Sequence, residues 1–290
     1  MEMFELKYFL AVAQVENVNR AAGNIHVSAG SLSKTIARLE DELQTPLFFK
    51  SGRGIRLTPE GLVLKQRAFQ IVQLEEDARL ELTGREAGSL NVYLSSEEIL
   101  QTYFGLEVVE KIGKLYPRAK THFLIRSEAQ AIDQLLNGEV HFALITQEPP
   151  AEVASKILSR VEFQTCASKH HPLIKKYGSK AIPIEEVLKH PFVLPDSTIL
   201  GKIAKANSTD GWRDDKFPRQ VKYKVCGLKL MEQFVHRGMA LGYLPDYCVR
   251  ESALVPLNVS GCPFSCLQTV RIIAKNPSAL NWMSRLWNQI

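Results

Sequence analysis

The sequence SAGSLSKTIARLE, from Ser28 to Glu40, has the pattern of an amphipathic helix that starts at a capping residue. Ser28 is a good N-cap, and an apolar stripe with steps of four, three and four residues follows it: Leu32, Ile36, Leu39 and Leu43. We expect this stripe to be buried. Three acids stand near the C-terminal end, where the helix dipole disfavours them: Glu40, Asp41 and Glu42. The basic, hydroxyl-rich start therefore predicts a helix that meets a polyanion with its N-terminus.

Two shorter helices are predicted before it. The first has apolar residues at helical spacing: Phe4 or Leu6, then Phe9, Leu10 and Ala13. Asn17 is a good N-cap for the second helix, which Gly23-Asn24 would end. Two successive helices of this kind predict a helix-turn-helix, whose second helix places its first residues at the base edges of DNA.

A hairpin and a long helix are predicted after it. Residues 47–49 and 55–57 are strand-like runs, and Arg53 stands between two glycines at the tip. Thr58 and Pro59 then begin a helix. Its apolar seam has steps of three and four, with Glu75 as the one misfit: Gly61, Leu64, Ala68, Ile71, Ala78 and Leu82. This predicts a winged helix-turn-helix and a helix that pairs with a second copy of the chain. A core helix of a single domain is the alternative.

The composition of the 290 residues is that of an ordinary globular protein, with a net charge of +5. Between Arg20 and Arg67 there are eight basic and four acidic residues, which suits phosphate binding. We find no signal peptide and no run of about 18 apolar residues, so we expect a cytoplasmic protein. The odd count of five cysteines favours reduced thiols. No phosphate loop, nucleophile elbow or catalytic carboxylate pair is recognisable, so we expect neither an enzyme nor a cofactor.

Residues 4–64 resemble the N-terminal domain of LysR-type transcriptional regulators. The resemblance rests on Phe9-Leu10, Ala13, Arg20-Ala21-Ala22, His26-Val27-Ser28, Leu32-Ser33, Ile36, Leu39-Glu40, Leu43, Leu47-Phe48, Arg53, Leu57-Thr58 and Gly61. It implies an α/β protein with a winged helix-turn-helix, a dimerising linker helix and a periplasmic-binding-protein-like (type II) effector domain of two Rossmann-like subdomains. Members of the family usually assemble as dimers of dimers on promoter DNA.

The resemblance also implies domain boundaries and DNA contacts. Residues 1–58 would bind DNA, 59–88 would form the linker helix and hinge, and 89–290 the effector domain. Its subdomain I would comprise 89–161 and 268–290, and subdomain II 162–267. The expected DNA contacts are Asn19, Arg20, Ser28, Ala29, Gly30, Ser31, Ser33, Lys34, Arg38, Lys50 and Arg53. The family commonly has Gln and then Pro or Ser where this chain has Ala29-Gly30, so base reading would depend on Ser31, Ser33 and Lys34.

Strands and helices alternate beyond a polar hinge at residues 83–90. Strands at 90–94, 121–125 and 140–145 with helices at 97–115 and 128–137 predict a parallel sheet, with ligands outside the carboxyl ends of its strands. Carried over from the family pattern, the effector-binding residues are Ser95, Ser96, Arg126, Ser127, Thr146, Ser197 and Thr198. Hydroxyls beside helix N-termini suit a small polar or anionic ligand. Alternatively, each serine only caps the next helix.

We therefore predict a sequence-specific, DNA-binding transcriptional regulator whose promoter binding a small-molecule effector modulates. RNA polymerase is a candidate further partner. The alternative is a thiol-based redox-sensing regulator of the same family, because Cys226, Cys248, Cys262 and Cys266 lie in one half of the chain. A metal at Cys166, His170 and His171 is disfavoured, since no second ligand pair is evident. A freestanding solute-binding protein would not carry residues 1–82.

Overall fold

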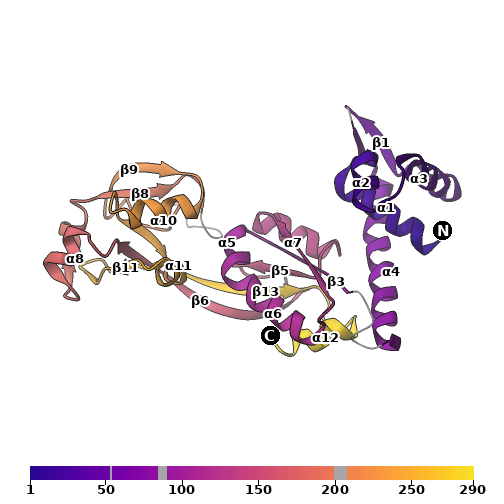
Figure 1. Cartoon of the computed structure of the whole chain (residues 1–290). Coiled ribbons are helices and arrows are strands. Elements are labelled where there is room, and N and C mark those ends of the chain that lie inside the picture. Colours follow the sequence, from indigo (N-terminus) through magenta and orange to yellow (C-terminus); the bar gives the residue numbers. More distant parts are fainter. Residues whose placement is uncertain (53, 84–89, 199–207) are drawn as a thin grey trace.

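The chain begins with three helices and a hairpin, followed by one long helix (Figure 1). The computed structural model describes residues 1–52, 54–83, 90–198 and 208–290, so the expected DNA contact Arg53 and residues 84–89 of the hinge lie outside the described residues. The first elements are α1 (Met3–Val15), α2 (Val18–Asn24), α3 (Ala29–Leu43), β1 (Phe48–Ser51), β2 (Gly54–Leu57) and α4 (Pro59–Thr83). This is the winged helix-turn-helix and linker helix that the sequence predicts; we call the β1–β2 hairpin the wing.

The capping residues read from the sequence set the starts of α2 and α3. The Asn17 side chain accepts a hydrogen bond from the Arg20 backbone N–H at 3.0 Å. The Ser28 hydroxyl accepts one from the Ser31 backbone N–H at 3.1 Å. Each cap satisfies a donor that the helix leaves unpaired and is worth about 1 kcal/mol. Both predicted caps are confirmed.

The core of the N-terminal domain lies where α1, α2 and α3 meet. Phe9, Leu32 and Leu39 are fully buried there, together with Leu6. The sequence left open whether Phe4 or Leu6 begins the buried stripe of the first helix. It is Leu6, since the side chain of Phe4 is 47% exposed. We expected Leu43 to be buried with the rest of the α3 stripe. Its side chain is 38% exposed, so this prediction is wrong. Leu43 belongs to the last turn of α3, and Gln44 ends the helix there with a left-handed φ of 51°.

Two lobes follow the linker helix. Lobe I consists of β3 (Asn91–Ser96), α5 (Glu98–Leu100), the π-helix η1 (Gln101–Gly105), α6 (Leu106–Leu115), β4 (Lys120–Ile125), α7 (Glu128–Leu136), β5 (Phe142–Ile145), β13 (Leu267–Ala274) and α12 (Asn281–Trp287). Lobe II consists of α8 (Pro172–Tyr177), β7 (Ile182–Pro183), α9 (Ile184–Val187), β8 (Pro191–Pro195), β9 (Gln220–Val225), α10 (Leu228–His236), β10 (Gly242–Pro245), α11 (Asp246–Glu251), β11 (Val255–Pro256) and β12 (Val259–Ser260).

The long strand β6 (Ala154–Ala167) joins the lobes within one sheet of strand order β10-β6-β13-β5-β3-β4. Its first part pairs with β13 in lobe I, and residues 163–166 pair with β10 in lobe II. Strand β3 lies parallel to both β4 and β5, as the alternation of strands and helices predicts. The carboxyl ends of these parallel strands therefore meet at one edge of lobe I.

The helix predicted over residues 97–115 contains a π-helical segment that the sequence did not indicate. This segment, η1, stands between α5 and α6. The buried Gln101 side chain donates hydrogen bonds to the carbonyl oxygens of Ser96 at 3.0 Å and Leu124 at 2.8 Å. It thereby ties η1 to the ends of β3 and β4. Single π-helical turns are often found at functional sites.

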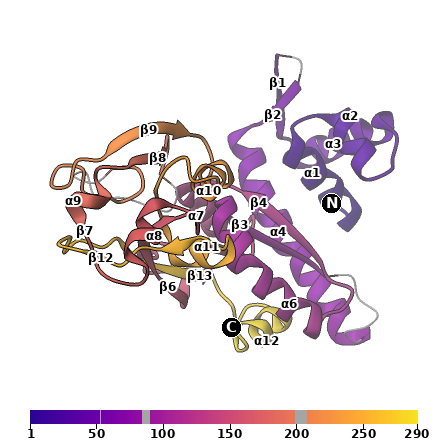
Figure 2. The same ribbon diagram turned by 60° about the vertical axis from the view of Figure 1, so that its left-hand side comes forward.

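The linker helix α4 lies alongside lobe I in two views of the chain (Figures 1 and 2). The buried His141 ring accepts a hydrogen bond at Nδ1 from the Tyr93 backbone N–H at 2.9 Å. The hydrogen is therefore on Nε2, which donates to Gln73 Oε1 of α4 at 2.7 Å. Burial and, after it, the neighbouring His122 lower the pKa of His141 to about 3. Further along α4, Asp77 accepts hydrogen bonds from the backbone N–H groups of Asn281 and Trp282 at the start of α12.

The seam expected on α4 needs correction at three positions. Gly61 is buried against Leu47, Ala68 is fully buried in the core of the N-terminal domain, and Leu64 packs against that core, so all three face their own chain. The remaining predicted seam residues are exposed, and Leu74 extends their line: Ile71, Ala78 and Leu82. Glu75, the misfit, forms ion pairs with Lys7 of α1 and Arg79. The helix therefore has two apolar faces, one packed within its own chain and one exposed.

Candidate functional site

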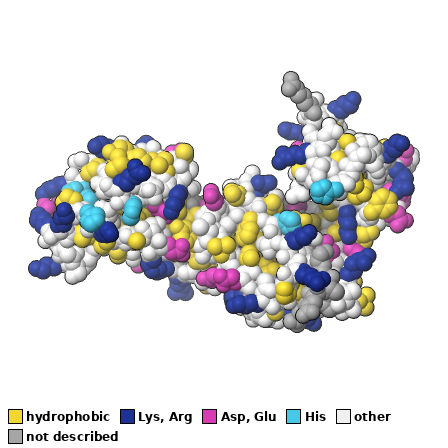
Figure 3. Space-filling model, in the orientation of Figure 1, with side chains coloured by type: hydrophobic (Ala, Val, Ile, Leu, Met, Phe, Trp, Pro, Cys, Tyr) yellow, Lys and Arg dark blue, Asp and Glu magenta, His cyan; other side chains and the backbone are white. Residues whose placement is uncertain are grey.

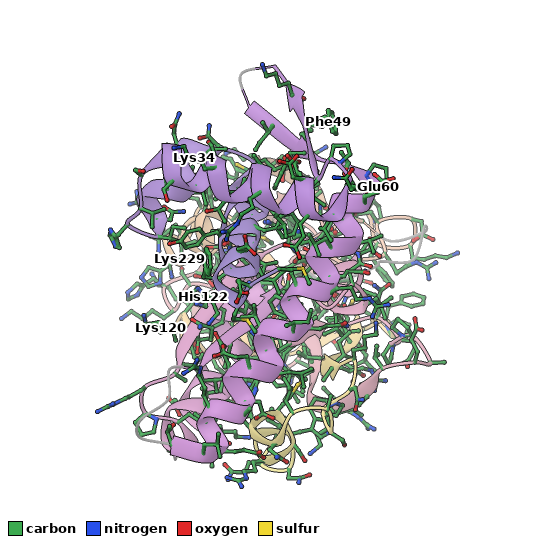
Figure 4. All side chains as sticks on the ribbon, turned by 90° about the vertical axis from the view of Figure 1, so that its right-hand side faces the viewer. Lys34, Phe49, Glu60, Lys120, His122 and Lys229 are labelled. Atoms are coloured by element: carbon green, nitrogen blue, oxygen red, sulfur yellow. The ribbon has the colours of Figure 1, made fainter. Side chains whose placement is uncertain are left out.

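The first candidate site is the exposed face formed by α2, the start of α3 and the wing. The side chains of Asn19, Arg20, Ser33 and Lys34 are exposed and make no hydrogen bond or ion pair within the described residues. Gly30 and Ser31 are exposed in the first turn of α3. Lys and Arg side chains gather over this end of the molecule (Figure 3), and Lys34 projects from α3 (Figure 4). The face combines free cations, hydroxyls and an accessible helix start.

Arg38, one of the expected DNA contacts, forms an ion pair within the chain. Its Nε donates a hydrogen bond to Glu5 Oε1 at 2.6 Å, and Glu5 is buried on α1. The guanidinium also lies over the Phe4 ring, 5.5 Å from its centroid. Removing Arg38 would leave a buried carboxylate without its cation. The arginine thus fixes α3 against α1, and we expect its loss to reduce stability.

The acidic residues at the C-terminal end of α3 bind backbone and terminal N–H groups of the same domain. Glu40 Oε1 accepts hydrogen bonds from the backbone N–H groups of Leu47 at 2.7 Å and Phe48 at 3.1 Å. The Glu42 carboxylate binds the N-terminal ammonium of Met1. Two of the three acids therefore have structural partners, which the charge pattern of the sequence did not reveal.

The wing is held in place by close backbone contacts. The Ile55 backbone N–H donates to the Glu16 carbonyl oxygen at 3.2 Å. Gly61, in the first turn of α4, approaches Leu47 so closely that a Cβ there would collide with the Leu47 carbonyl. Lys50 and Phe49 are exposed on β1, where Figure 4 labels Phe49. The described part of the wing therefore presents two exposed cations, Lys50 and Arg56, and the aromatic ring of Phe49.

The second candidate site is a cavity of about 790 Å³ between the lobes. Elements α5 and η1 of lobe I face the start of α10 in lobe II across it (Figure 1). Its described lining consists of Glu97, Glu98, Ile99, Thr102, Tyr103, Pro195, Ser197, Thr198, Cys226, Gly227, Leu228, Lys229, Leu230 and Glu232. The predicted Ser197 and Thr198 belong to this lining. The sequence did not single out its carboxylates, its lysine or Tyr103.

The predicted effector residues of lobe I do not reach this cavity. Ser95 and Ser96 are fully buried, and the Ser95 hydroxyl binds Gln134 Oε1 at 2.8 Å. Ser127 caps α7, as the alternative interpretation proposed. Arg126 is exposed, and its Nη1 donates to the Ile125 carbonyl oxygen at 2.8 Å. Thr146 is bonded to Glu128. The strand ends do converge, but their hydroxyls are occupied within the chain.

Glu128 lies at the strand ends where a small polar or anionic ligand was expected. Its Oε1 accepts hydrogen bonds from the Thr146 backbone N–H at 2.7 Å and the Thr146 hydroxyl at 2.6 Å. Its Oε2 accepts one from the Gln147 backbone N–H at 3.3 Å. The neighbouring Glu97 lines the cavity, where burial and the charge of Glu128 raise its pKa to about 7. A second anion would meet these carboxylates.

Tyr103 and Glu232 join the two lobes at the cavity. The Tyr103 hydroxyl, on η1, donates to Glu232 Oε1 on α10 at 3.1 Å. The Tyr103 ring also lies 4.5 Å from the Tyr247 ring of lobe II, measured between centroids. Lys229 Nζ donates to Glu232 Oε2 at 2.9 Å. The π-helical segment thus places an aromatic ring and its hydroxyl in the cleft.

Three of the five cysteines are poorly suited to redox chemistry. Cys166 and Cys248 are buried, and burial raises the pKa of both thiols. Burial and the charge of Asp210 raise the pKa of Cys266 to about 11. Reactive cysteines need the opposite shift of the pKa, toward the thiolate.

Across the described ranges, no group of three His, Cys, Asp or Glu side chains could hold a metal ion. None of the described helices is long and apolar enough to cross a membrane.

The comparisons with known proteins match both parts of this architecture. Residues 3–62 match the bacterial regulatory helix-turn-helix protein, lysR family, and residues 83–289 match the LysR substrate binding domain. The chain is 40% identical to the HTH-type transcriptional regulator YofA of Bacillus velezensis, over 86% of this chain and 83% of YofA. It is 27% identical to the transcriptional dual regulator GltC of Bacillus subtilis, over 87% of this chain and 83% of GltC.

A solved structure shares the fold over nearly the whole chain. The crystal structure of ArgP from Mycobacterium tuberculosis superposes with a TM-score of 0.65 at 17% identity, over 98% of this chain and 94% of ArgP. At this identity the likeness concerns the arrangement of helices and strands only.

Proposed function

The chain belongs to the LysR family of DNA-binding transcriptional regulators, and we propose that the start of α3 and the wing hold promoter DNA while a small molecule in the cleft modulates that binding. The family consists of regulators rather than enzymes. Promoter DNA and its regulator would meet in the cytoplasm. The observation that carries the proposal is that the Asn19, Ser33 and Lys34 side chains are exposed and have no hydrogen-bond or ion-pair partner among the described residues.

Specific DNA contact would use the two kinds of group on this face. Lys34, Arg20 and Lys50 would neutralise phosphates, which supplies affinity without sequence preference. Ser31, Ser33 and Asn19 would reach base edges, since hydroxyl and amide groups read the major groove. Ala29 offers a methyl group, which suits thymine. The proposal leaves part of the specificity to DNA shape at the wing.

We further propose that the exposed apolar line on α4 pairs two copies of the chain. Ile71, Leu74, Ala78 and Leu82 recur at steps of three and four residues, and Leu82 is 86% exposed. Apolar seams of this spacing bury themselves against a partner helix. A dimer would place two α3 helices on spaced half-sites. We also propose that two such dimers assemble into a dimer of dimers. The proposed domain boundaries lie between residues 58 and 59 and between residues 88 and 89.

Coupling between the two sites would pass through lobe I. Strand β5 runs between His141, which contacts α4, and Thr146, which is bonded to Glu128 near the cavity. A ligand that changes the lobe arrangement would therefore act on the surface that holds the linker helix. Such an effect requires different affinities of the ligand for two arrangements. The redox alternative receives no support from the raised thiol pKa values.

Selection of duplexes from a random DNA pool by the full-length protein tests the proposal. We expect a common sequence motif and footprints consistent with two half-sites. Recovery of no preferred sequence, with binding that depends only on salt concentration, would show that the protein is not a sequence-specific regulator.

A further inference from the structure

The charge of the cavity indicates what kind of molecule it takes. Among its described lining residues, three are carboxylates and one is a cation: Glu97, Glu98 and Glu232 against Lys229. At the strand ends beside it, the N–H groups of Thr146 and Gln147 are already bonded to Glu128. An anionic ligand would find those donors occupied and would be repelled by the carboxylates. Charge complementarity therefore favours a cation.

Glu232 is the best-placed carboxylate to receive that cation. Its side chain is 2% exposed, so it is largely desolvated and needs strong partners. Oε1 has the Tyr103 hydroxyl, and Oε2 has the ammonium of Lys229. Lys229 itself is 83% exposed and reaches the carboxylate from solvent. An exposed ammonium gives up its ion pair at little cost.

Lys229 thus occupies the position that a ligand's charged group would take. The surrounding walls suit the rest of such a molecule, since Ile99, Leu228 and Leu230 supply apolar surface. Tyr103 offers an aromatic ring, and a cation near a ring face is stabilised by its quadrupole. A ligand held between Glu232 of lobe II and Tyr103 of lobe I would also contact both lobes.

We infer that the cleft binds a cationic small molecule, an amine or amidine with an apolar stem, whose charged group replaces Lys229 on Glu232. This inference rests on the proposed function, because it names the class of molecule that the effector site of the regulator takes. It makes Lys229 a competitor of the ligand rather than a ligand-binding residue. Removal of the Lys229 ammonium should therefore raise the affinity for the ligand, whereas at an anion site it would lower it.

Two pairs of probes with matched stems and opposite charges test the inference. The full-length protein is titrated calorimetrically with phenethylamine and phenylacetate, and with putrescine and succinate. We expect at least one amine to bind and each acid to bind more weakly than its amine. The inference is overturned if neither amine binds, or if an acid binds more tightly than its matched amine.

Two variants sharpen this result. Lys229→Met removes the competing ammonium, so amine affinity should rise about fivefold to tenfold, whereas an anion site would lose affinity. Glu232→Gln should lower amine affinity about tenfold or more. Lys176→Met, on the surface of lobe II, is the matched control and should change neither. Lower amine affinity in Lys229→Met contradicts the inference, even if Glu232→Gln proves too unstable to measure.

The duplex selection separates this inference from the proposed function. A protein that selects a DNA motif but prefers acids remains a regulator with a different effector class. A protein that selects no motif has lost the proposed function, whatever it binds in the cleft.

Discussion

The DNA-binding face and the strand ends of lobe I beside the cleft use polar side chains in opposite ways. At the first, Asn19, Ser33 and Lys34 stand in water and bond to nothing else in the described part of the chain. At the second, the hydroxyl of Thr146 and the buried carboxylate of Glu128 are bonded to each other. Solvated groups cost little to leave unpaired, whereas a carboxylate that has lost water must be paired. Substitutions should therefore reduce binding at the DNA-binding face and stability at these strand ends.

The largest effect is expected from Ser33→Ala combined with Lys34→Ala. Loss of a base-edge hydroxyl and a phosphate cation should weaken binding to the selected duplex at least about a hundredfold, or ~3 kcal/mol. Fluorescence anisotropy measures the affinity, and denaturant unfolding should give an unchanged free energy. Lys176→Ala serves as the control. If the double variant binds DNA like the parent protein, α3 is not the reading helix.

Glu128→Ala should act on stability instead. The change leaves two backbone N–H groups and the Thr146 hydroxyl without their acceptor, so the free energy of unfolding should fall by about 2–3 kcal/mol. Glu148→Ala removes an exposed carboxylate only two residues beyond Thr146 and should cost less than about 0.5 kcal/mol. Equal effects of the two variants would mean that Glu128 does not stabilise the strand ends of lobe I.

The pH dependence of unfolding should reveal Glu97. Its pKa is raised from 4.5 to about 7 in the folded chain, so the folded state holds the proton more tightly than the unfolded state does. Its contribution to stability is therefore present below pH 4.5 and is lost as the pH rises to about 7, a decrease on the order of 2 kcal/mol. Chemical denaturation of the parent protein and Glu97→Gln at several pH values measures this. The same slope in both proteins would contradict the assignment.

The smallest effect concerns the contact between α4 and lobe I. Gln73→Leu leaves the buried Nε2–H of His141 without its acceptor, which should cost about 1 kcal/mol. Gln14→Leu, on the exposed face of α1, should be neutral. If the Gln73 variant is as stable as the parent while its ligand response changes, the contact serves coupling and contributes nothing to stability.

The N-terminal domain could be predicted closely because its signals are local. Caps at Asn17 and Ser28 and the spacing of Leu32, Ile36 and Leu39 depend on neighbours within a few residues. The local pattern did not reveal the long-range contacts of this domain. Arg38 reaches Glu5, 33 residues away, and Ala68 packs into the three-helix core rather than against a partner.

The cleft could be located from the sequence but not described. Alternating strands and helices indicate where the sheet edge lies, and Ser197 and Thr198 do line the cavity. The bonding across the cavity depends on pairs far apart in sequence, such as Tyr103 with Glu232. The π-helical segment that positions Tyr103 has no pattern that distinguishes it from an ordinary helix. Which polar group faces a ligand is therefore a property of the folded chain.

Ala29→Gln tests most directly the central claim that the first residues of α3 read base edges. Ala29 stands in the first turn of α3, directly after the Ser28 cap. Glutamine at this position would present an amide able to recognise adenine. Duplex selection with the parent protein and the variant should yield motifs that differ at one or more positions within each half-site. Identical motifs from both proteins would show that this end of α3 does not contact the bases.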